Sequence, residues 1–132
     1  MKRLSITLLL LLSITILVYA ADKKALKVYV EGDTTVIARM IQSLRDRQEE
    51  YGFKLTFVEN MSDTWDIRIV LAAEGTGVWN YAQGSAIVLN KECRVIAAEM
   101  RSNRLTDKGA TNAVAKEIIK NLHQFYGTKQ RD

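Results

Sequence analysis

The sequence has few of the residues that build common catalytic and metal centres. Its 132 residues include one cysteine, one histidine and no proline. A single cysteine excludes a disulfide within the chain, and one cysteine with one histidine cannot supply the three or four ligands of a zinc site. A general base would also need a reacting group held within hydrogen-bond reach, and His123 has no marked partner in the sequence. We therefore predict no metal, no cofactor and no catalytic residue, with His123 at the solvent-facing margin of a helix.

The chain also has only a small excess of charge of one sign. The 19 basic and 15 acidic residues give a formal net charge of +4, and no block of five or six like charges occurs. This balance does not indicate a nucleic-acid partner. Hydrophobic residues make up 48% of the chain and charged residues 26%, which is the composition of an ordinary globular protein.

The longest hydrophobic run lies at the N-terminus. Lys2 and Arg3 form a short positive head, and the residues from Leu4 to Val18 are apolar apart from four serines and threonines. Small residues then precede a cleavage point after Ala20, so the three regions of a secretory signal follow in order. We predict a signal peptide over residues 1–20, a single domain over 21–132, and a periplasmic or secreted location.

The alternative interpretation of the same segment is an uncleaved anchor. A helix from Leu4 to Ala21 would span about 27 Å, just under the thickness of a bilayer core. Contact with a membrane is expected only in that case. A lipid on a cysteine at the cleavage point is excluded, because the cysteine of the chain is Cys93. We expect Cys93 to be buried as a small apolar residue, with pairing between chains as the alternative.

Hydrophobic periodicity predicts an α+β fold. Alternating residues indicate strands, and residues at helical spacing indicate helices capped near Asp33 and near Thr106 or Asp107. The expected strands cover 25–30, 53–57, 65–71, 85–89 and 93–100, and the expected helices cover 34–50 and 107–126. The order is β-α-β-β-β-β-α, which favours a two-layer sandwich with a mixed, mostly antiparallel sheet of four or five strands and both helices on one face. The first two strands are expected to flank a right-handed crossover, and consecutive strands to pair antiparallel.

The stretch from Glu74 to Gly84 has no clear period and is expected to be an irregular connection. Its glycines lack the lysine and hydroxyl of a phosphate-binding loop. Trp79, Asn80 and Tyr81 are the candidate binding residues, because aromatic rings in an irregular loop suit contact with a partner protein or a sugar. The alternative is that one ring packs against the edge of the core.

Acidic residues are numerous but scattered. Asp63 and Asp66 lie at the rim of an expected strand, and no pair stands out in the sequence. Two carboxyl groups can nevertheless meet in space from distant positions. Two acidic side chains within about 5 to 10 Å in one pocket would indicate a hydrolase.

The layout of the mature chain resembles that of small bacterial envelope domains. The residues that carry the resemblance are the first strand with Lys27 to Gly32, the helix beginning at Asp33, the hairpin from Ser85 to Met100 and the helix from Ala110 to Leu122. The order of elements is similar to that of the curli-secretion lipoprotein family and of the N-terminal domain of the periplasmic Tol translocation protein. The resemblance implies an accessory or assembly domain and not an enzyme. The lipid-bearing cysteine and the proline-containing end of the first strand in the curli family are absent here.

Together these observations favour an exported, non-catalytic accessory or binding domain of the bacterial cell envelope. Its partner is expected to be an envelope protein or a cell-wall component. The expected contact surfaces are the 74–84 segment and the open edge or face of the sheet. The alternative function is a small hydrolase or saccharide-processing enzyme that uses scattered carboxylates.

Overall fold

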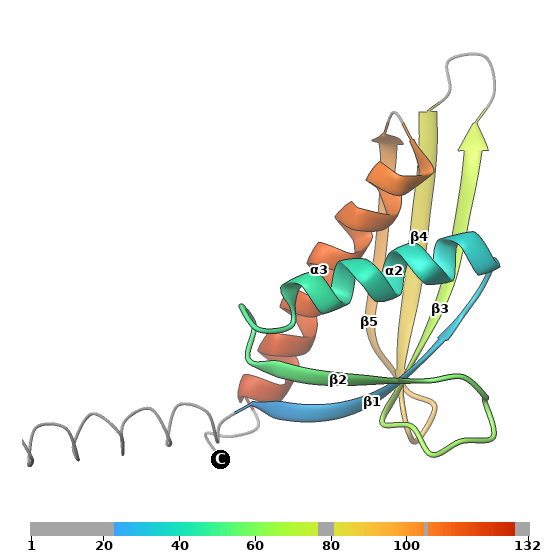
Figure 1. Ribbon diagram of the computed structural model, residues 1–132. Helices are drawn as coiled ribbons and strands as arrows, with labels where there is room; N and C mark the ends of the chain where they lie inside the picture. Colours follow the sequence, from blue (N-terminus) through green and yellow to red (C-terminus); the bar gives the residue numbers. More distant parts are fainter. Residues whose placement is uncertain (1–22, 77–80, 105, 129–132) are drawn as a thin grey trace, which may run out of the picture.

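The computed structural model describes residues 23–76, 81–104 and 106–128, which form one five-stranded sheet and two helices (Figure 1). The signal peptide predicted over 1–20, and with it Trp79 and Asn80, lies outside the described residues. The predicted α+β class and element order are confirmed. The elements are β1 (Lys24–Glu31), α2 (Thr34–Arg47), β2 (Phe53–Val58), β3 (Ile67–Thr76), β4 (Tyr81–Asn90), β5 (Val95–Arg104) and α3 (Asp107–Thr128).

Helix α2 begins and packs as its sequence predicts. The Asp33 side chain accepts a hydrogen bond from the backbone N–H of Thr35 at 3.0 Å, which satisfies one of the free amides of the first turn. Val36, Met40 and Leu44 repeat at four-residue spacing and are all buried. The stripe therefore faces the core.

Helix α3 begins after Thr106, which is one of the two predicted caps. The Thr106 hydroxyl accepts from the backbone N–H of Gly109 at 3.0 Å, and the Thr106 carbonyl accepts from that of Ala110 at 3.0 Å. The helix runs through Gly127 to Thr128, so the expected stop at Gly127 is wrong. Gly127 does not adopt a positive φ, and the helix simply continues through it.

Strand β1 lies between two parallel neighbours, β2 and β3. The strand order is β2-β1-β3-β4-β5, and β1 is parallel to both of its neighbours. The predicted crossover from β1 through α2 to β2 is confirmed. Strands β3, β4 and β5 are antiparallel as expected, but the expectation of antiparallel pairing is wrong for the consecutive strands β2 and β3, which lie on opposite sides of β1.

The stagger of the strands explains how β2 and β3 can be parallel. The last residue of β2 is level with Tyr29, and β3 begins level with Val28. The segment 59–66 therefore crosses β1 without running back along the sheet. Asp66 fixes its end, because the Asp66 carboxylate accepts from the backbone N–H of Lys27 at 2.8 Å and the Asp66 N–H donates to the Lys27 carbonyl at 2.9 Å.

The expected irregular connection from Glu74 to Gly84 is mostly regular strand. Strand β3 continues to Thr76, β4 begins at Tyr81, and these two residues pair with each other. Glycine and short polar side chains remove the period-two signal from this stretch, whereas ladder hydrogen bonds need only the backbone. Of the expected connection, residues 77–80 lie outside the described part of the chain.

Gly84 permits a close approach of α3 to β4. A Cβ atom at this position would lie 3.3 Å from both the carbonyl carbon and the Cβ of Ala110, which is fully buried. The helix backbone cannot easily retreat, because α3 is held by its other buried contacts with the sheet. Gly84 therefore sets the distance between the helix layer and the sheet.

We expect Gly84→Val to lower the free energy of unfolding by about 1 to 3 kcal/mol, because the added atoms overpack the contact with Ala110. Urea unfolding followed by circular dichroism measures this change. Ser85→Val adds the same branched side chain to the opposite face of β4, and its effect should stay within about 0.5 kcal/mol. Equal destabilisation by the two variants would contradict the close-packing role of Gly84.

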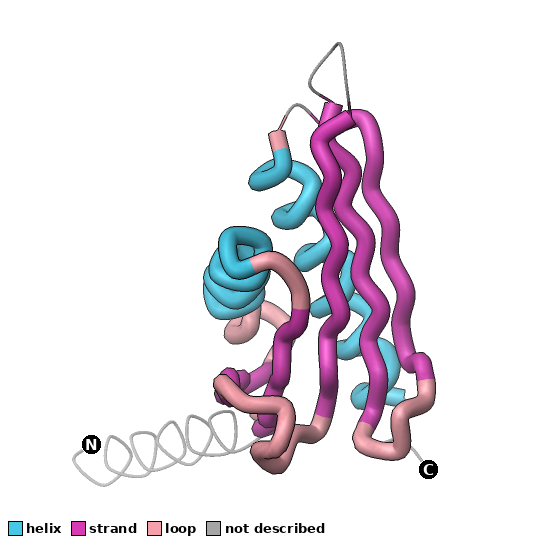
Figure 2. The backbone as a smooth tube through the Cα atoms, turned by 90° about the vertical axis from the view of Figure 1, so that its right-hand side faces the viewer, coloured by secondary structure: helices cyan, strands magenta, loops and turns pink. Residues whose placement is uncertain are grey.

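Both helices pack on one face of the sheet, as predicted (Figure 2). The core between the layers joins buried residues of α2 and α3 to alternate residues of the strands, such as Val28, Ile67 and Val88. At the β5 edge, the Asn121 amide of α3 donates to the Glu99 carboxylate at 2.6 Å. Neither of the two described helices packs on the opposite face of the sheet, so within the described residues its side chains are left to solvent or to a partner.

Cys93 lies in the turn between β4 and β5 and is exposed, so the expectation that it is buried in a strand is wrong. Its N–H donates to the Asn90 carbonyl at 2.9 Å and its φ is 58°. The Asn90 side chain also accepts from the backbone N–H groups of Glu92 and Arg94. This is a tight turn followed by a left-handed residue, a common hairpin connection that favours glycine where Cys93 stands.

Cys93→Gly should raise the free energy of unfolding by about 0.5 to 1 kcal/mol, because glycine adopts the left-handed conformation without the steric cost of a Cβ. Thermal unfolding under reducing conditions measures the effect. Glu92→Gly is the matched control, since Glu92 does not have a positive φ and glycine there should destabilise the hairpin. A loss of stability in Cys93→Gly would contradict the strained turn.

Candidate functional site

The sheet face that the helices leave uncovered is lined largely by apolar side chains. Its members alternate with the buried core residues along each strand, and their cross-strand pairs place them side by side. Leu89 lies between Arg68 and Val95, and Ile87 lies between Val70 and Ala98. We call this surface the open face; its apolar members are Tyr29, Val70, Ile87, Leu89, Val95, Ala98 and Met100.

Three large side chains of the open face are well exposed. Ile87 is 45% exposed, Val95 62% and Met100 60%, and all three lie on the neighbouring strands β4 and β5. Single exposed apolar residues are ordinary, but a group on adjacent strands forms a contiguous patch. The open face is thus a candidate contact surface.

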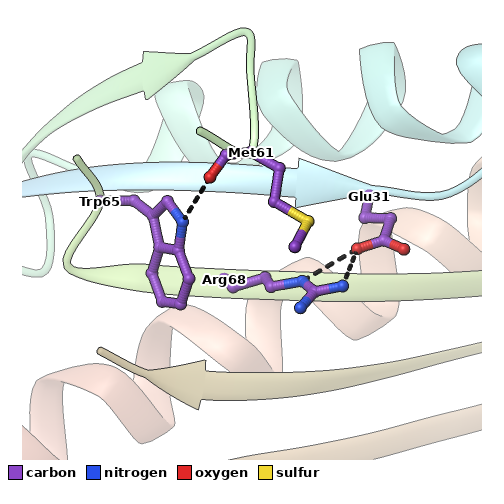
Figure 3. A network of polar contacts seen from close by, with 4 residues as sticks. All are labelled: Glu31, Met61, Trp65 and Arg68. Carbon is purple, nitrogen blue, oxygen red and sulfur yellow. Dashed lines mark hydrogen bonds and ion pairs between the residues drawn. The ribbon is translucent and has the colours of Figure 1, made fainter. Parts of the chain in front are cut away.

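One ion pair lies within this apolar surface. The Arg68 side chain donates through Nε to a Glu31 carboxylate oxygen at 2.9 Å, and a second guanidinium nitrogen contacts the same oxygen (Figure 3). At its margin, the Trp65 indole N–H donates to the Met61 carbonyl at 3.2 Å. Because Arg68 and Glu31 neutralise each other, they leave the open face without net charge at its centre.

A second candidate site lies at the end of the sheet where β1 begins and α3 ends (Figure 1). A cavity of about 210 Å³ opens there, with Lys24, Asp66, Asn90, Lys91 and Glu92 as its polar lining and Phe125 and Tyr126 among its apolar lining. We call it the Tyr126 pocket. Four separate segments of the chain meet around it.

A smaller cavity of about 110 Å³ adjoins the Tyr126 pocket and shares Lys24 and Tyr126 with it. Tyr51, Phe53 and His123 line the smaller cavity. The Phe53 and Tyr126 rings meet edge to face with centroids 6.3 Å apart, and the Tyr51 and His123 rings do so at 5.8 Å. These contacts hold the walls of the smaller cavity in place.

Tyr126 has the most perturbed electrostatics in the described part of the chain. Burial raises its pKa above the ordinary value, and the carboxylates of Asp66 and Glu92 raise it further. The Lys24 ammonium lies over the Tyr126 ring, 5.4 Å from the centroid. Like any tyrosine, Tyr126 is protonated at neutral pH and can donate a hydrogen bond, and it lines the pocket.

Glu92→Gln should lower the pKa of Tyr126, because the substitution removes a negative charge that disfavours the phenolate. A tyrosinate absorbance titration measures this, with Tyr126→Phe used to assign the signal. Glu59→Gln removes an exposed carboxylate that does not act on Tyr126 and should leave the titration unchanged.

Because the pKa of Tyr126 is raised, the free energy of unfolding depends on pH in the alkaline range. An unfolded tyrosine loses its proton near pH 10, while Tyr126 in the folded protein still holds it. The stability that Tyr126 contributes is therefore present below pH 10 and is lost as the pH rises through the folded pKa. A titration in which wild type and Glu92→Gln coincide would contradict the placement of Glu92 beside this phenol.

The residues predicted from the sequence to bind a partner lie wholly or partly outside what the structure describes. Trp79 and Asn80 lie outside the described residues, and Tyr81 is the first residue of β4, where its backbone pairs with Thr76. The predicted role of the three residues as a contact loop stays a prediction. The expected margin position of His123 is confirmed, because the side chain is exposed and its Nδ1 lies 3.1 Å from the Tyr51 carbonyl oxygen.

The structure brings together two carboxylates that the sequence leaves apart. Asp66 and Glu92 both line the Tyr126 pocket, although they are separated in the chain by all of β3 and β4. Asp66 is already bonded to the Lys27 amide, which gives it a structural role. The aromatic pair Phe125 and Tyr126 gave no signal in the sequence beyond the helical repeat.

The described residues form neither a metal centre nor a membrane-spanning helix. No group of three or more histidine, cysteine, aspartate or glutamate side chains in these ranges could hold a metal ion. Within the same part of the chain, neither helix combines the length and the apolar character needed to cross a membrane.

Comparison with known proteins gives a likeness of architecture. No protein-family model and no curated protein sequence matches the chain. Among solved structures, the chain is similar to a PelC variant from Paraburkholderia phytofirmans that forms a dodecamer. The two chains are 14% identical and superpose with a TM-score of 0.42 over 77% of this chain and 86% of the PelC chain. The likeness concerns the arrangement of helices and strands and not a shared function.

Proposed function

We propose that the protein is an exported, non-catalytic accessory domain of the bacterial cell envelope that binds a partner protein through the open face of its sheet. The observation that carries the proposal is the exposure of Ile87, Val95 and Met100 on the open face of β4 and β5, where Leu89 pairs with Val95 and Ala98 pairs with Ile87. Each large apolar side chain left in water forgoes about 1.5 to 3 kcal/mol that full burial would contribute. A partner that covers the three would recover part of this free energy.

The chemistry of the open face indicates what kind of partner fits. Strands β3, β4 and β5 present a surface of mainly β-branched, aliphatic and methionine side chains, with Gln83 and Ser85 beside Met100. The charge of Arg68 is neutralised by Glu31. An apolar sheet or helix face of another protein would match such a surface, because it brings no charge that must be desolvated. A membrane-binding surface usually combines apolar residues with unpaired lysine and arginine, which the centre of this face does not offer.

Substitution and site-specific crosslinking test this proposal. A photo-crosslinking residue at Val95 or Met100 should capture an envelope protein in intact cells, whereas the same residue at the exposed Ala38 of α2 should not. Ile87→Glu places a charge in the apolar surface and should reduce the Val95 crosslink at least tenfold. Ala38→Glu is the matched control on the helix layer and should leave the crosslink unchanged.

Three outcomes would overturn the proposal. Crosslinks of equal yield from Ala38 would show that the contact is not specific to the open face. Capture of only a second copy of this chain would show that the open face mediates self-association and not contact with another protein. Partition of the purified protein onto lipid vesicles that Ile87→Glu abolishes would show that the surface binds a membrane. Circular dichroism of each variant confirms that its fold is retained.

The alternative function, a small hydrolase or saccharide-processing enzyme, has one observation in its favour. Asp66 and Glu92 line one pocket, and two-carboxylate hydrolysis requires two such groups about 5 to 10 Å apart. The hydrogen bond from the Lys27 amide engages one oxygen of Asp66, and Glu92 lies exposed in the β4–β5 turn. Asp66 is only partly buried and Glu92 is exposed, so neither has the apolar surroundings of a catalytic general acid, and we favour the binding function.

A further inference from the structure

The Tyr126 pocket is a second candidate binding site that is separate from the open face. It lies at the end of the sheet, among the start of β1, the β4–β5 turn and the end of α3. The three exposed residues of the open face do not line it. A ligand in this pocket would therefore leave the open face free for a protein partner.

The charges in the lining of the pocket balance. Two cations, Lys24 and Lys91, stand with two carboxylates, Asp66 and Glu92. A site with this balance gives no net attraction to an anionic or a cationic ligand. The same groups supply both hydrogen-bond donors and acceptors at close quarters, and the Asn90 amide adds its N–H donors, because its oxygen already accepts from the backbone of Glu92 and Arg94. Hydroxyl groups donate and accept at once, so a ligand rich in hydroxyls matches this lining.

The remaining wall of the pocket is aromatic. The Phe125 and Tyr126 rings meet at a centroid distance of 5.1 Å and lie nearly perpendicular, so they present apolar surface in two orientations. A sugar ring carries hydroxyls around its rim and apolar C–H groups on its face. Small-molecule sites combine an apolar wall with polar groups that fix orientation, and in this pocket the polar share is the larger, as a ligand rich in hydroxyls requires. The protonated hydroxyl of Tyr126 adds a donor on this wall.

The volumes of the two cavities limit the size of the ligand that they can hold. The pocket of about 210 Å³ is smaller than a site for a drug-sized molecule, and the adjoining cavity of about 110 Å³ is smaller still. Since the two share Lys24 and Tyr126, one ligand can extend from the first into the second. We propose that the Tyr126 pocket binds one or two neutral residues of a glycan chain, with Lys24, Glu92 and Tyr126 as hydrogen-bond partners of its hydroxyls.

Titration of the purified protein with defined oligosaccharides tests this inference. The probes are the neutral tetramers of glucose in α-1,4 and β-1,4 linkage and of N-acetylglucosamine, with a tetramer of galacturonate as the charged control. Backbone amide chemical shifts report the site and the affinity. At least one neutral tetramer should shift the amides of residues 24–26, 90–92 and 125–126, and the galacturonate tetramer should bind at least fivefold more weakly.

Variants at the pocket separate a specific site from adventitious contact. Glu92→Gln and Lys24→Met alter exposed side chains and should weaken binding at least fivefold, while Tyr126→Phe should weaken it with the ring retained. Lys116→Met, on the exposed side of α3, is the matched control and should bind like the wild type. Ile87→Glu should also bind like the wild type, because the open face does not contribute to the pocket.

Three results would overturn the inference. The first is that none of the neutral tetramers shifts the pocket amides at 10 mM, a concentration about tenfold above a 1 mM dissociation constant. The second is tighter binding of the galacturonate tetramer than of every neutral one. The third is equal binding by the wild type and both exposed-residue variants. Release of reducing ends that Glu92→Gln abolishes would instead support the pocket and overturn the non-catalytic function, whereas failure of the open-face crosslinks would overturn only the protein partner.

Discussion

The architecture depends on the fact that two helices cover only one face of a five-stranded sheet. A strand alternates its side chains between the two faces, so every strand that buries residues under α2 or α3 must also present residues on the far side. In β4, Val88 is fully buried and Ile87, its neighbour in the chain, is 45% exposed. The open face is therefore a direct consequence of the fold. The choice of isoleucine, valine and methionine for it is a property of the sequence that the fold does not require.

The second candidate site depends on the stagger around β1. Because β1 pairs with β2 along its first half and with β3 along its second, the segment 59–66 must cross it, and Asp66 anchors that crossing to Lys27. The crossing places a carboxylate beside the first residues of β1. The β4–β5 turn adds Glu92 and the end of α3 adds Tyr126, so the pocket exists only when these segments are all in place.

The sequence predicted the parts of this structure that rest on local patterns. The stripe from Val36 to Leu44 has the periodicity of a buried helix face, and Asp33 has the chemistry of an N-cap. The sequence did not predict the strand ends correctly where tertiary packing or turn geometry, and not alternating polarity, decides which residue occupies a position. Gly84 was predicted to lie in an irregular connection, but it belongs to β4. Glycine stands there because α3 passes close to the strand, and a local pattern cannot reveal that tertiary contact. Cys93 was predicted to begin a strand, but it occupies a left-handed turn position that glycine would normally fill.

Neither candidate site could be predicted residue by residue from the sequence, and the reason is the same for both. Arg68 and Glu31 are 37 positions apart in the chain, and they meet because β1 and β3 are neighbours in the sheet. Each site also neutralises its own charges, through this ion pair on the open face and through paired cations and carboxylates in the Tyr126 pocket. Long-range electrostatic steering, which salt screens, would contribute little to recognition at such surfaces. Contact area and the direction of hydrogen bonds would then decide what binds, so the net charge of +4 says little about the partners of this protein.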